Sequence, residues 1–386
     1  MKIAIDFRMA QFHREGIVRA ALGLVEALKH DHEIHLVLSN PDIRIPEIEQ
    51  DGNLHLHYIG PKSMKLSLWW ENVTLITLLR KLMPRIYCAP FNTGLPYKRI
   101  PGIAYVAVLH DIIPRIYPDC IPFSELVRWR ISIGATVKNA DRIITDSDFS
   151  GKDIQRLLGI PGDIIRVQPI YIDDKFKNPN SDRDGINTVK SRYGLQGDYL
   201  LYYGGFRKYK NASKVIEVYD RYRSDYSGDL KLCIAGKIAG RFKDNIIPEI
   251  QASKYKNDIM LPGFIADDDL PFIVKGAKVL LYLSRYEGFG YVPLEAQACG
   301  IPVVCAKNTA LLENMADSVL WVGDGDTSDR IAGQIHRMLN DEALRAEWIH
   351  LGQSNVQRFS KEKYIRSIME IFDDAARMEN RDGKVL

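Results

Sequence analysis

The feature that most constrains the fold of this chain is a regular alternation of short β-rich runs with amphipathic helical segments. The strand candidates are 2–6, 33–39, 54–59, 103–110, 142–147, 164–168, 199–204, 230–236, 258–263, 278–284, 302–306 and 319–322. Between them, segments such as 17–29 and 329–341 carry apolar residues at i, i+3 and i+4 spacing. Alternation on this scale predicts an α/β protein whose parallel sheets are covered by helices on both faces.

The length of the chain and one polar interruption predict two domains. The sequence has 386 residues, which is more than one hydrophobic core normally supports. Residues 173–190 are polar and have no periodic apolar pattern. We therefore predict a doubly wound domain over 1–172, a linker over 173–190 and a second doubly wound domain over 191–360. Ligands of such folds bind at the carboxyl ends of strands, so we expect the functional loops to line a central cleft.

Composition and charge exclude several classes of protein. With 46% hydrophobic and 26% charged residues, the chain is globular and not disordered. Its 52 basic and 49 acidic residues nearly balance, which gives no support for a nucleic-acid partner. The five cysteines form no C-x-x-C pair, as is typical of reduced thiols in a cytoplasmic protein. Residues 1–7 are too short for a signal peptide, and no apolar run reaches the roughly 18 residues of a membrane span. We expect a cytoplasmic protein, at most peripheral at the inner membrane face.

The stretch 286–300, YEGFGYVPLEAQACG, places two glutamates around two glycines, a tyrosine and a proline. It directly follows the strand candidate 278–284. Glu295 is suited to accept hydrogen bonds from a ribose, and Glu287 is suited to bind hydroxyl groups of whatever the neighbouring phosphate carries. The alternative interpretation is an ordinary strand–turn–helix in which both glutamates only cap.

The residues between these glutamates predict an anion site. Pro293 suits the first turn of a helix, because it lacks an amide hydrogen and its φ is already helical. The amides of Gly290, Tyr291 and Val292 would then point outward with the positive end of the helix dipole, as a pyrophosphate requires. Two carboxylates on either side of an anion site describe a nucleotide-sugar site.

A second loop, 204–213, combines glycines with positive charge. Gly204 and Gly205 allow close backbone approach, and Arg207 and Lys210 supply cations. A departing nucleoside diphosphate needs such cations, because charge builds on the leaving oxygen as the bond breaks. The alternative is a solvated lysine-rich turn.

In the first half of the chain, Gly16 begins a helix after the first strand, and His110 and Asp111 close the strand 103–110. A plain turn and a structural histidine are the alternative interpretations. The histidines within 30–35 and 55–57 lack a clear metal-ligand spacing. The aspartates of 146–148, 267–269 and 324–326 match turns or helix caps. We therefore expect no metal and no bound cofactor. The sequence has no Walker loop, G-x-S-x-G or G-x-G-x-x-G motif, which disfavours P-loop, hydrolase and simple dehydrogenase chemistry.

Taken in order, these motifs strongly resemble glycosyltransferase family four, the retaining GT-B enzymes. The matching segments are 16–19, 109–119, 141–160, 205–211, 263–270 and 283–304, the last of which contains the family's E-x7-E motif with its EGFG core. The resemblance covers most of the chain. It implies two Rossmann-like domains facing a central cleft, with a final helix in 361–386 that packs on the N-terminal domain.

The resemblance also implies roles for individual residues. Arg207 and Lys210 would bind the donor diphosphate, Glu287 the transferred sugar, and His110 would lie beside the reacting sugar. The implied catalytic set is His110, Glu287, Arg207 and Lys210. The implied donor-binding set is Gly16, Phe264, Gly288, Phe289, Gly290, Tyr291, Val292 and Glu295, with Asp111 and Arg19 on the acceptor side.

The combination of G-I-x-R, H-D-x-I-P and E-G-F-G is similar to bacterial mannosyltransferases of O-antigen and exopolysaccharide assembly. It implies a GDP-mannose donor and a saccharide acceptor carried on polyprenyl diphosphate. Residues 66–83 have a broad apolar face with tryptophan and flanking basic residues, which suits a helix resting on a lipid surface. The alternative is a helix packed on its own sheet.

Other functions that fit the same cleft are transfer from a UDP-sugar, a non-catalytic sugar-nucleotide sensor or scaffold, and an epimerase or hydrolase. For transfer with retention, a covalent intermediate needs a carboxylate nucleophile. The motifs direct Glu287 to sugar hydroxyls and Glu295 to ribose, and leave Asp111 on the acceptor side. We therefore predict front-face displacement, in which the leaving diphosphate itself accepts the proton of the acceptor.

Overall fold

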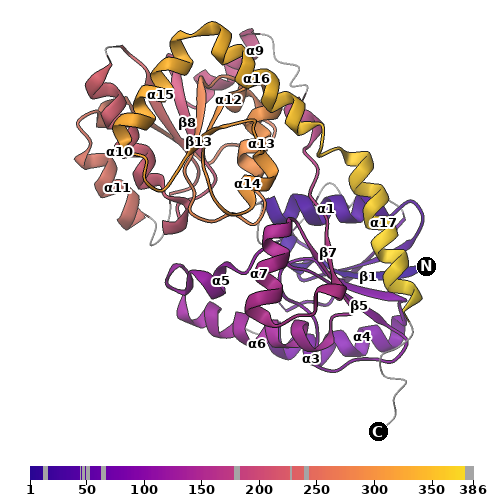
Figure 1. The fold of residues 1–386 in the computed structure, drawn as a ribbon. Coiled ribbons are helices and arrows are strands. Elements are labelled where there is room, and N and C mark those ends of the chain that lie inside the picture. Colours follow the sequence, from indigo (N-terminus) through magenta and orange to yellow (C-terminus); the bar gives the residue numbers. More distant parts are fainter. Residues whose placement is uncertain are drawn as a thin grey trace. The chain divides into compact units, whose positions relative to one another are not determined.

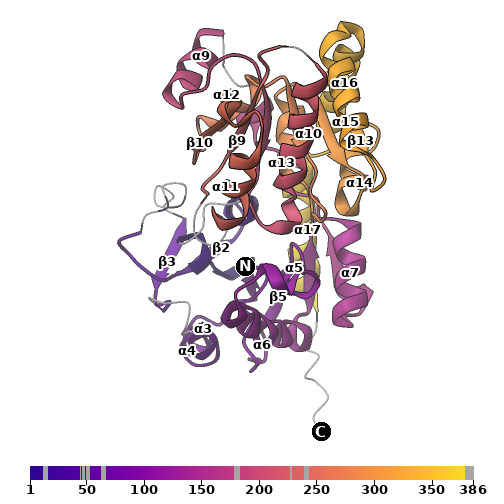
Figure 2. The ribbon, with the colours of Figure 1, turned by 90° about the vertical axis from the view of Figure 1, so that its left-hand side faces the viewer.

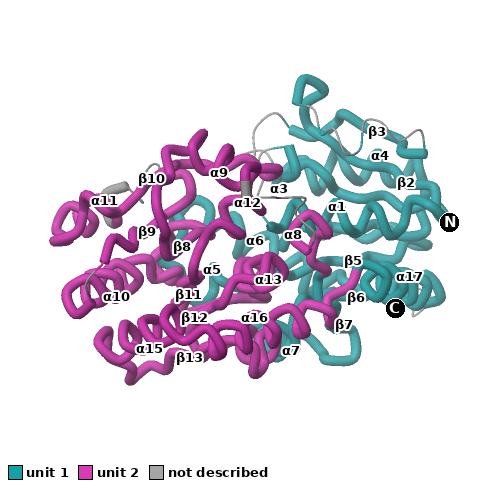
Figure 3. The backbone as a smooth tube through the Cα atoms, turned by 90° about the horizontal axis from the view of Figure 1, so that it is seen from above, with its two compact units in different colours: residues 1–170, 361–386 teal, residues 171–360 magenta. Residues whose placement is uncertain are grey.

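The structure is a computed structural model of the full chain. It describes residues 1–11, 16–43, 45, 48, 53–61, 67–177, 183–226, 228–238 and 243–378. The chain divides into two compact units, residues 1–170 with 361–386 and residues 171–360 (Figure 3). Each unit is a parallel sheet with helices on both faces (Figure 1). The predicted α/β fold with two doubly wound sheets is confirmed.

The sheet of unit 1 has buried inner strands and two partly exposed edge strands, β3 and β7. They are β1 (Lys2–Asp6), β2 (Glu33–Leu38), β3 (Leu54–Tyr58), β4 (Ile86–Ala89), β5 (Ala104–Val108), β6 (Arg142–Thr145) and β7 (Ile165–Val167). Their order is β3-β2-β1-β4-β5-β6-β7, and all neighbours run parallel. The direction in which the chain adds strands therefore reverses between β1 and β4, the position where doubly wound sheets bind ligands.

Helices on both faces of this sheet supply the rest of the core of unit 1. They are α1 (Gly16–Leu28), α3 (Ser67–Asn72), α4 (Thr74–Leu82), α5 (Ile113–Ile116), α6 (Phe123–Asn139), α7 (Asp148–Leu158) and α17 (Lys361–Arg377). The last helix of the chain, α17, packs beside α1 within this unit. Asp374 on α17 accepts a hydrogen bond from Arg142 Nε at 2.7 Å, and Phe372 is fully buried. The C-terminal segment thus completes the core of the unit that contains the N-terminus.

Unit 2 repeats the same architecture. Its strands are β8 (Tyr199–Tyr203), β9 (Lys231–Ala235), β10 (Ile259–Gly263), β11 (Val279–Tyr282), β12 (Val303–Ala306) and β13 (Leu320–Val322), in the order β10-β9-β8-β11-β12-β13. Its helices are α8 (Asp174–Lys177), α9 (Arg183–Arg192), α10 (Ala212–Asp225), α11 (Lys243–Ala252), α12 (Leu270–Lys275), α13 (Tyr291–Ala298), α14 (Thr309–Met315), α15 (Ser328–Asn340) and α16 (Glu342–Val356). The order reverses between β8 and β11, and doubly wound sheets generally bind ligands at such a position.

Two segments differ from their predicted form. The predicted helix 66–83 is broken at Val73 into α3 and α4, because Val73 has φ −123° and ψ −70° and leaves the helical region. Its apolar residues Leu75, Ile76 and Leu79 are buried in the core of unit 1, so this part packs on its own sheet. The segment 173–190, predicted as a linker, contains α8 and most of α9 and groups with unit 2.

None of the helices in the described part of the chain combines the length and the apolar run that crossing a bilayer requires.

Candidate functional site

The loops after β8 and β11 carry the basic and acidic residues that the sequence singled out in unit 2. These two strands are neighbours in the sheet, with Val279 paired to Leu200 and Leu280 to Leu201. Both loops therefore emerge at the same carboxyl edge, at the point where the strand order reverses. Parallel sheets of this type bind ligands at that edge.

Lys210 and Glu287 meet at this edge. Lys210 Nζ lies 2.7 Å from Glu287 Oε1, and the side chains are only 16% and 10% exposed. Tyr282, the last residue of β11, donates its hydroxyl to the same carboxylate oxygen at 2.7 Å and accepts from Lys210 Nζ at 3.2 Å. Burial, together with the charge of Glu287, raises the pKa of Tyr282 well above its ordinary value, so the phenol remains a hydrogen-bond donor. The arrangement holds one cation and one carboxylate in fixed positions.

The turn into α13 is built around Gly290. This residue precedes the helix with φ +101°, and a Cβ at this position would lie 2.7 Å from Leu311 Cδ2. Tyr291 and Val292 are the first two residues of α13, in the turn where helix amides point along the axis away from the helix. Pro293 falls in the first turn of α13. The backbone geometry is that of a helix N-terminus, which favours an anion.

Glu295, the fifth residue of α13, is 1% exposed and accepts a hydrogen bond from the Tyr203 hydroxyl at 2.9 Å. The same hydroxyl lies 3.2 Å from the carbonyl oxygen of Val292. Tyr203 ends β8 as Tyr282 ends β11. Each glutamate of the E-x7-E motif is thus oriented by the tyrosine that terminates a neighbouring strand.

The other predicted donor-binding residues of unit 2 lie on the same loops or on the loop after β10. Arg207 is half-buried and directly precedes the 3-10 turn Lys208–Lys210. Phe264 follows β10 and is 58% exposed. Phe289 is buried against Tyr291 and Phe359, and its carbonyl accepts from Asn314 Nδ2 at 2.7 Å. Gly288 lies between Glu287 and Phe289 in the same loop. Phe264 thus presents an exposed ring, whereas Phe289 packs inside the unit.

His110 follows β5 in unit 1 and is held by buried partners. Its Nδ1 lies 2.8 Å from Asp146 Oδ2, and its Nε2 lies 3.1 Å from the carbonyl oxygen of Pro90. Its backbone amide donates to Asn92 Oδ1 at 2.7 Å. Burial acts to lower the pKa of His110, but the charge and hydrogen bond of Asp146, helped by Asp111, outweigh it and raise that pKa above its ordinary value. The imidazole is poised to carry a proton.

A small pocket in unit 1 opens beside this pair. Its wall contains His110, Asp146, Gln168 and, from α17, Tyr364. The Asp111 carboxylate accepts a hydrogen bond from the amide of Ile113, the first residue of α5, at 3.0 Å.

The remaining predicted residues of unit 1 lie on α1. Gly16 is the first residue of α1 and Arg19 lies in its first turn, half-buried. Taking each unit by itself, the fold places His110 beside Asp146 in unit 1 and brings Lys210 and Glu287 into contact in unit 2.

Sequence reasoning missed three residues of these clusters. Asp146 matches turn or cap chemistry in the sequence, but the cap of α7 is Ser147, whose side chain accepts from the Ser150 amide. Asp146 itself is buried against His110. Tyr203 and Tyr282 have the sequence pattern of ordinary strand residues. What would have identified all three is their position at the carboxyl ends of β6, β8 and β11.

Two doubly wound parallel sheets, with a cation–carboxylate pair and a helix N-terminus at the switch point of one of them, are typical of nucleotide-binding proteins of the two-domain α/β class. Family comparisons agree with this class. A model described as glycosyl transferases group 1 matches residues 188–355, and one described as glycosyltransferase family 4 matches residues 14–176. The chain belongs to glycosyltransferase family four and has the GT-B fold, so it is a glycosyltransferase.

The chain is also similar in sequence to individual curated proteins and in fold to individual solved structures. It is 28% identical to O-antigen chain mannosyltransferase B of Escherichia coli, over 94% of this chain and 97% of that protein. It is 23% identical to the serotype-specific mannosyltransferase WbdA of Escherichia coli, over 67% of this chain but only 32% of that protein. Among solved structures, HepE of Anabaena in complex with UDP-glucose superposes with a TM-score of 0.76 at 15% identity, covering 97% of this chain and 100% of that one. The last match supports the fold.

Proposed function

We propose that this enzyme transfers mannose from GDP-mannose, with retention of configuration and without a metal ion, to a saccharide acceptor on polyprenyl diphosphate. The product would be a bacterial surface polysaccharide. The observation that carries the proposal is the Lys210–Glu287 pair at the β8/β11 switch point, next to the start of α13. The mannosyltransferase names of the two relatives at 28% and 23% identity favour mannose as the transferred sugar.

The chemistry follows from the charges at this edge. Lys210 and Arg207 would stabilise the charge that develops on the leaving diphosphate, and the α13 amides would bind its oxygens. When the donor binds, the Lys210 ammonium group would move partly away from Glu287 and contact the donor phosphate. Glu287 would then accept hydrogen bonds from sugar hydroxyls.

Front-face displacement is supported by the same contacts. Glu287 is engaged by Lys210 and Tyr282, and Glu295 is engaged by Tyr203. Neither carboxylate is arranged as a nucleophile. The leaving diphosphate would take the proton of the acceptor hydroxyl as the new glycosidic bond forms. His110 would shape the site around the developing oxocarbenium ion.

Contact with the membrane that carries the acceptor is best supported by α6. This helix exposes an apolar and basic face made of Phe123, Val127, Ile131, Val137, Arg130 and Lys138. Phe123 is 79% exposed. An amphipathic face of this kind binds an anionic lipid surface. In the region 66–83, Trp69 remains available, with 61% of its surface exposed.

The test incubates the purified chain with a synthetic lipid-diphosphate saccharide and GDP-mannose, with and without EDTA. We expect GDP release, a mannosylated product with retained anomeric configuration by NMR, and equal rates in EDTA. Turnover with UDP-sugars instead of GDP-mannose would refute the assignment of GDP-mannose as the donor. Binding of GDP-mannose without any transfer would identify a sensor, and free mannose without acceptor would identify a hydrolase. A glycosyl adduct on Glu287 or Asp111, trapped with a slow fluorinated donor, would refute front-face displacement.

Vesicle flotation tests the membrane contact. The wild-type chain should float with anionic vesicles, and Phe123→Ser with Ile131→Ser should not. Leu312→Ser, which changes an exposed apolar residue of unit 2, is the matched control and should float as wild type does. Equal flotation of all three proteins would refute a role for α6.

A further inference from the structure

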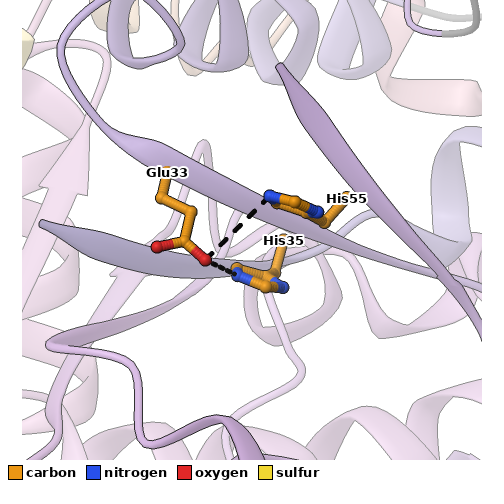
Figure 4. Close-up of side chains that lie close together, drawn as sticks. All are labelled: Glu33, His35 and His55. Atoms are coloured by element: carbon orange, nitrogen blue, oxygen red, sulfur yellow. Dashed lines mark hydrogen bonds and ion pairs between the residues drawn. The ribbon is translucent and has the colours of Figure 1, made fainter. Parts of the chain in front are cut away.

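Three potential metal ligands meet on the outer strands of the unit 1 sheet. Glu33 and His35 lie two residues apart on β2, and His55 on the edge strand β3 is the register partner of His35. Residues two apart in a strand point to the same face, so all three side chains project together. Figure 4 shows the Glu33 carboxylate directed toward both imidazoles, and Figure 2 shows β3 outside β2 in this unit.

The distances fit one bound ion. Glu33 Oε1 lies 2.9 Å from His35 Nε2 and 4.0 Å from His55 Nε2, and all three ligand atoms lie within 4.8 Å of one another. Zinc bonds of about 2.0–2.2 Å in tetrahedral geometry hold ligand atoms roughly 3.3 Å apart. The two separations from Glu33 Oε1, 2.9 Å and 4.0 Å, bracket that value, so small side-chain adjustments complete the geometry. Two histidines and one glutamate form a known zinc ligand set with an open fourth position.

A fourth residue, His57, is hydrogen-bonded to the second ring nitrogen of His35. His57 Nε2 lies 2.8 Å from His35 Nδ1, on the side of the ring away from Glu33. When His35 Nδ1–H donates to His57, the ring is in the Nδ1–H tautomer and its Nε2 lone pair faces Glu33. A metal ion bound between His35 and Glu33 requires this tautomer. Metal-bound histidines regularly use the second ring nitrogen for such a hydrogen bond, which fixes the orientation of the ring.

We propose that Glu33, His35 and His55 bind a divalent transition-metal ion, with Zn²⁺ as the expected ion, and that His57 is a positioning residue for His35. Imidazole with one carboxylate selects borderline ions such as Zn²⁺ over the hard ions Mg²⁺ and Ca²⁺. Lys2, whose Nζ lies 3.9 Å from Glu33 Oε1 in a partly exposed pair, would turn outward when the ion binds.

The position of the site indicates a structural role. Glu33 is the first residue of β2 and His55 the second residue of β3, so the site lies at the amino ends of the strands. His110, in contrast, follows the carboxyl end of β5. The ion would fasten the edge strand β3 to β2 and stabilise unit 1 without taking part in glycosyl transfer.

The test is a Zn²⁺ titration of the EDTA-stripped, dialysed full-length chain, followed by calorimetry and by the thermal unfolding midpoint. We expect one Zn²⁺ per chain and a higher midpoint, with no response to Mg²⁺. Glu33→Gln and His55→Ala change side chains that are 48% and 53% exposed, so both variants should fold. Each should weaken Zn²⁺ binding by more than the roughly 10–100-fold that loss of an outer-shell partner typically causes. His57→Ala should weaken it by about that smaller factor.

His30→Ala is the matched control, because His30 is an exposed histidine of the same unit with a 68% exposed side chain. It should bind Zn²⁺ as the wild type does. The proposal is overturned if the wild type takes up no stoichiometric Zn²⁺, or if Glu33→Gln and His55→Ala bind it as tightly as the wild type. Equal transfer rates for stripped and zinc-loaded enzyme would agree with the structural role, and a zinc-dependent rate would overturn that role.

Discussion

Lys210 and Glu287 are positioned before any donor arrives. The short contacts with each other and with Tyr282 place both groups in a nearly buried setting, where electrostatic interactions are stronger than in water. A cation held in this way needs little reorganisation when charge develops on a leaving group.

Lys210→Ala should therefore lower kcat by about 10²–10³, the loss typical of removing one preorganised donor to a developing anion. Steady-state GDP release with GDP-mannose measures this. Lys208→Ala is the matched control, since Lys208 is exposed in the same 3-10 turn, and it should retain wild-type turnover. Equal kcat for Lys210→Ala and wild type would contradict the assigned role.

The His110–Asp146 pair makes stability depend on pH in a defined direction. Asp146 raises the folded-state pKa of His110 above its ordinary 6.5. A raised histidine pKa means that the pair stabilises the fold fully below pH 6.5 and that this stabilisation is lost as pH rises through the folded-state value.

Asp146→Asn should accordingly reduce the free energy of unfolding more at about pH 5.5 than at about pH 8.5. Urea unfolding at both pH values measures the difference, and NMR titration should show a lower His110 pKa in the variant. Asp148→Asn serves as the control, because Asp148 is exposed in the first turn of α7. A larger loss for Asp146→Asn at high pH than at low pH would show that the sign is wrong.

At the scale of elements, the junction between β11 and α13 depends on one backbone conformation. Gly290 has φ +101°, and the space that a Cβ would need is occupied by Leu311. Two independent penalties, backbone strain and overpacking, thus oppose any side chain at this position.

Gly290→Ala should lower the free energy of unfolding by about 2–4 kcal/mol and weaken donor binding, because the turn that sets the α13 amides is displaced. Gly194→Ala separates the two penalties. Gly194 has φ +67°, and no heavy atom lies within 4 Å of the point where an alanine methyl group would sit, so only about 1 kcal/mol of backbone strain is expected. Chemical denaturation of both variants measures this, and equal losses would show that packing against Leu311 contributes nothing.

At the scale of the whole molecule, the end of the chain belongs to the unit that contains its start. Helix α17 places Phe372, Ile368 and Ala375 in the interior of unit 1, and Asp374 bonds with Arg142 and Arg166. Unit 1 therefore cannot complete its core until the last helix of the chain is available.

Phe372→Ala should destabilise the protein by about 3–5 kcal/mol, the range for large-to-small changes in a packed core. Glu370 is an exposed residue on the same helix, so Glu370→Ala should change the free energy of unfolding by no more than about 0.5 kcal/mol. Thermal and urea unfolding give both values, and similar stabilities for the two variants would mean that α17 is dispensable to unit 1.

The sequence determined the class of fold and nearly all of its strands, because buried parallel strands are continuous apolar runs and surface helices are amphipathic. It did not reveal β4. That strand is only Ile86–Ala89, enclosed by prolines at 84 and 90, so it shows no run long enough to be recognised. The strand is nevertheless central, because it pairs with β1 and β5 and forms the switch point of unit 1.

The sequence by itself also indicated which loops we propose to carry chemistry, since glycine, proline and charged residues in the E-x7-E and basic loops have local conformational reasons to be there. Only the tertiary structure decided which side chains meet. Lys210 reaches Glu287, Asp146 reaches His110, and His55 reaches Glu33 through strand pairing between residues distant in the chain. Local sequence pattern reports backbone preference and burial, whereas such contacts depend on sheet order and register, which are set by packing across the whole unit.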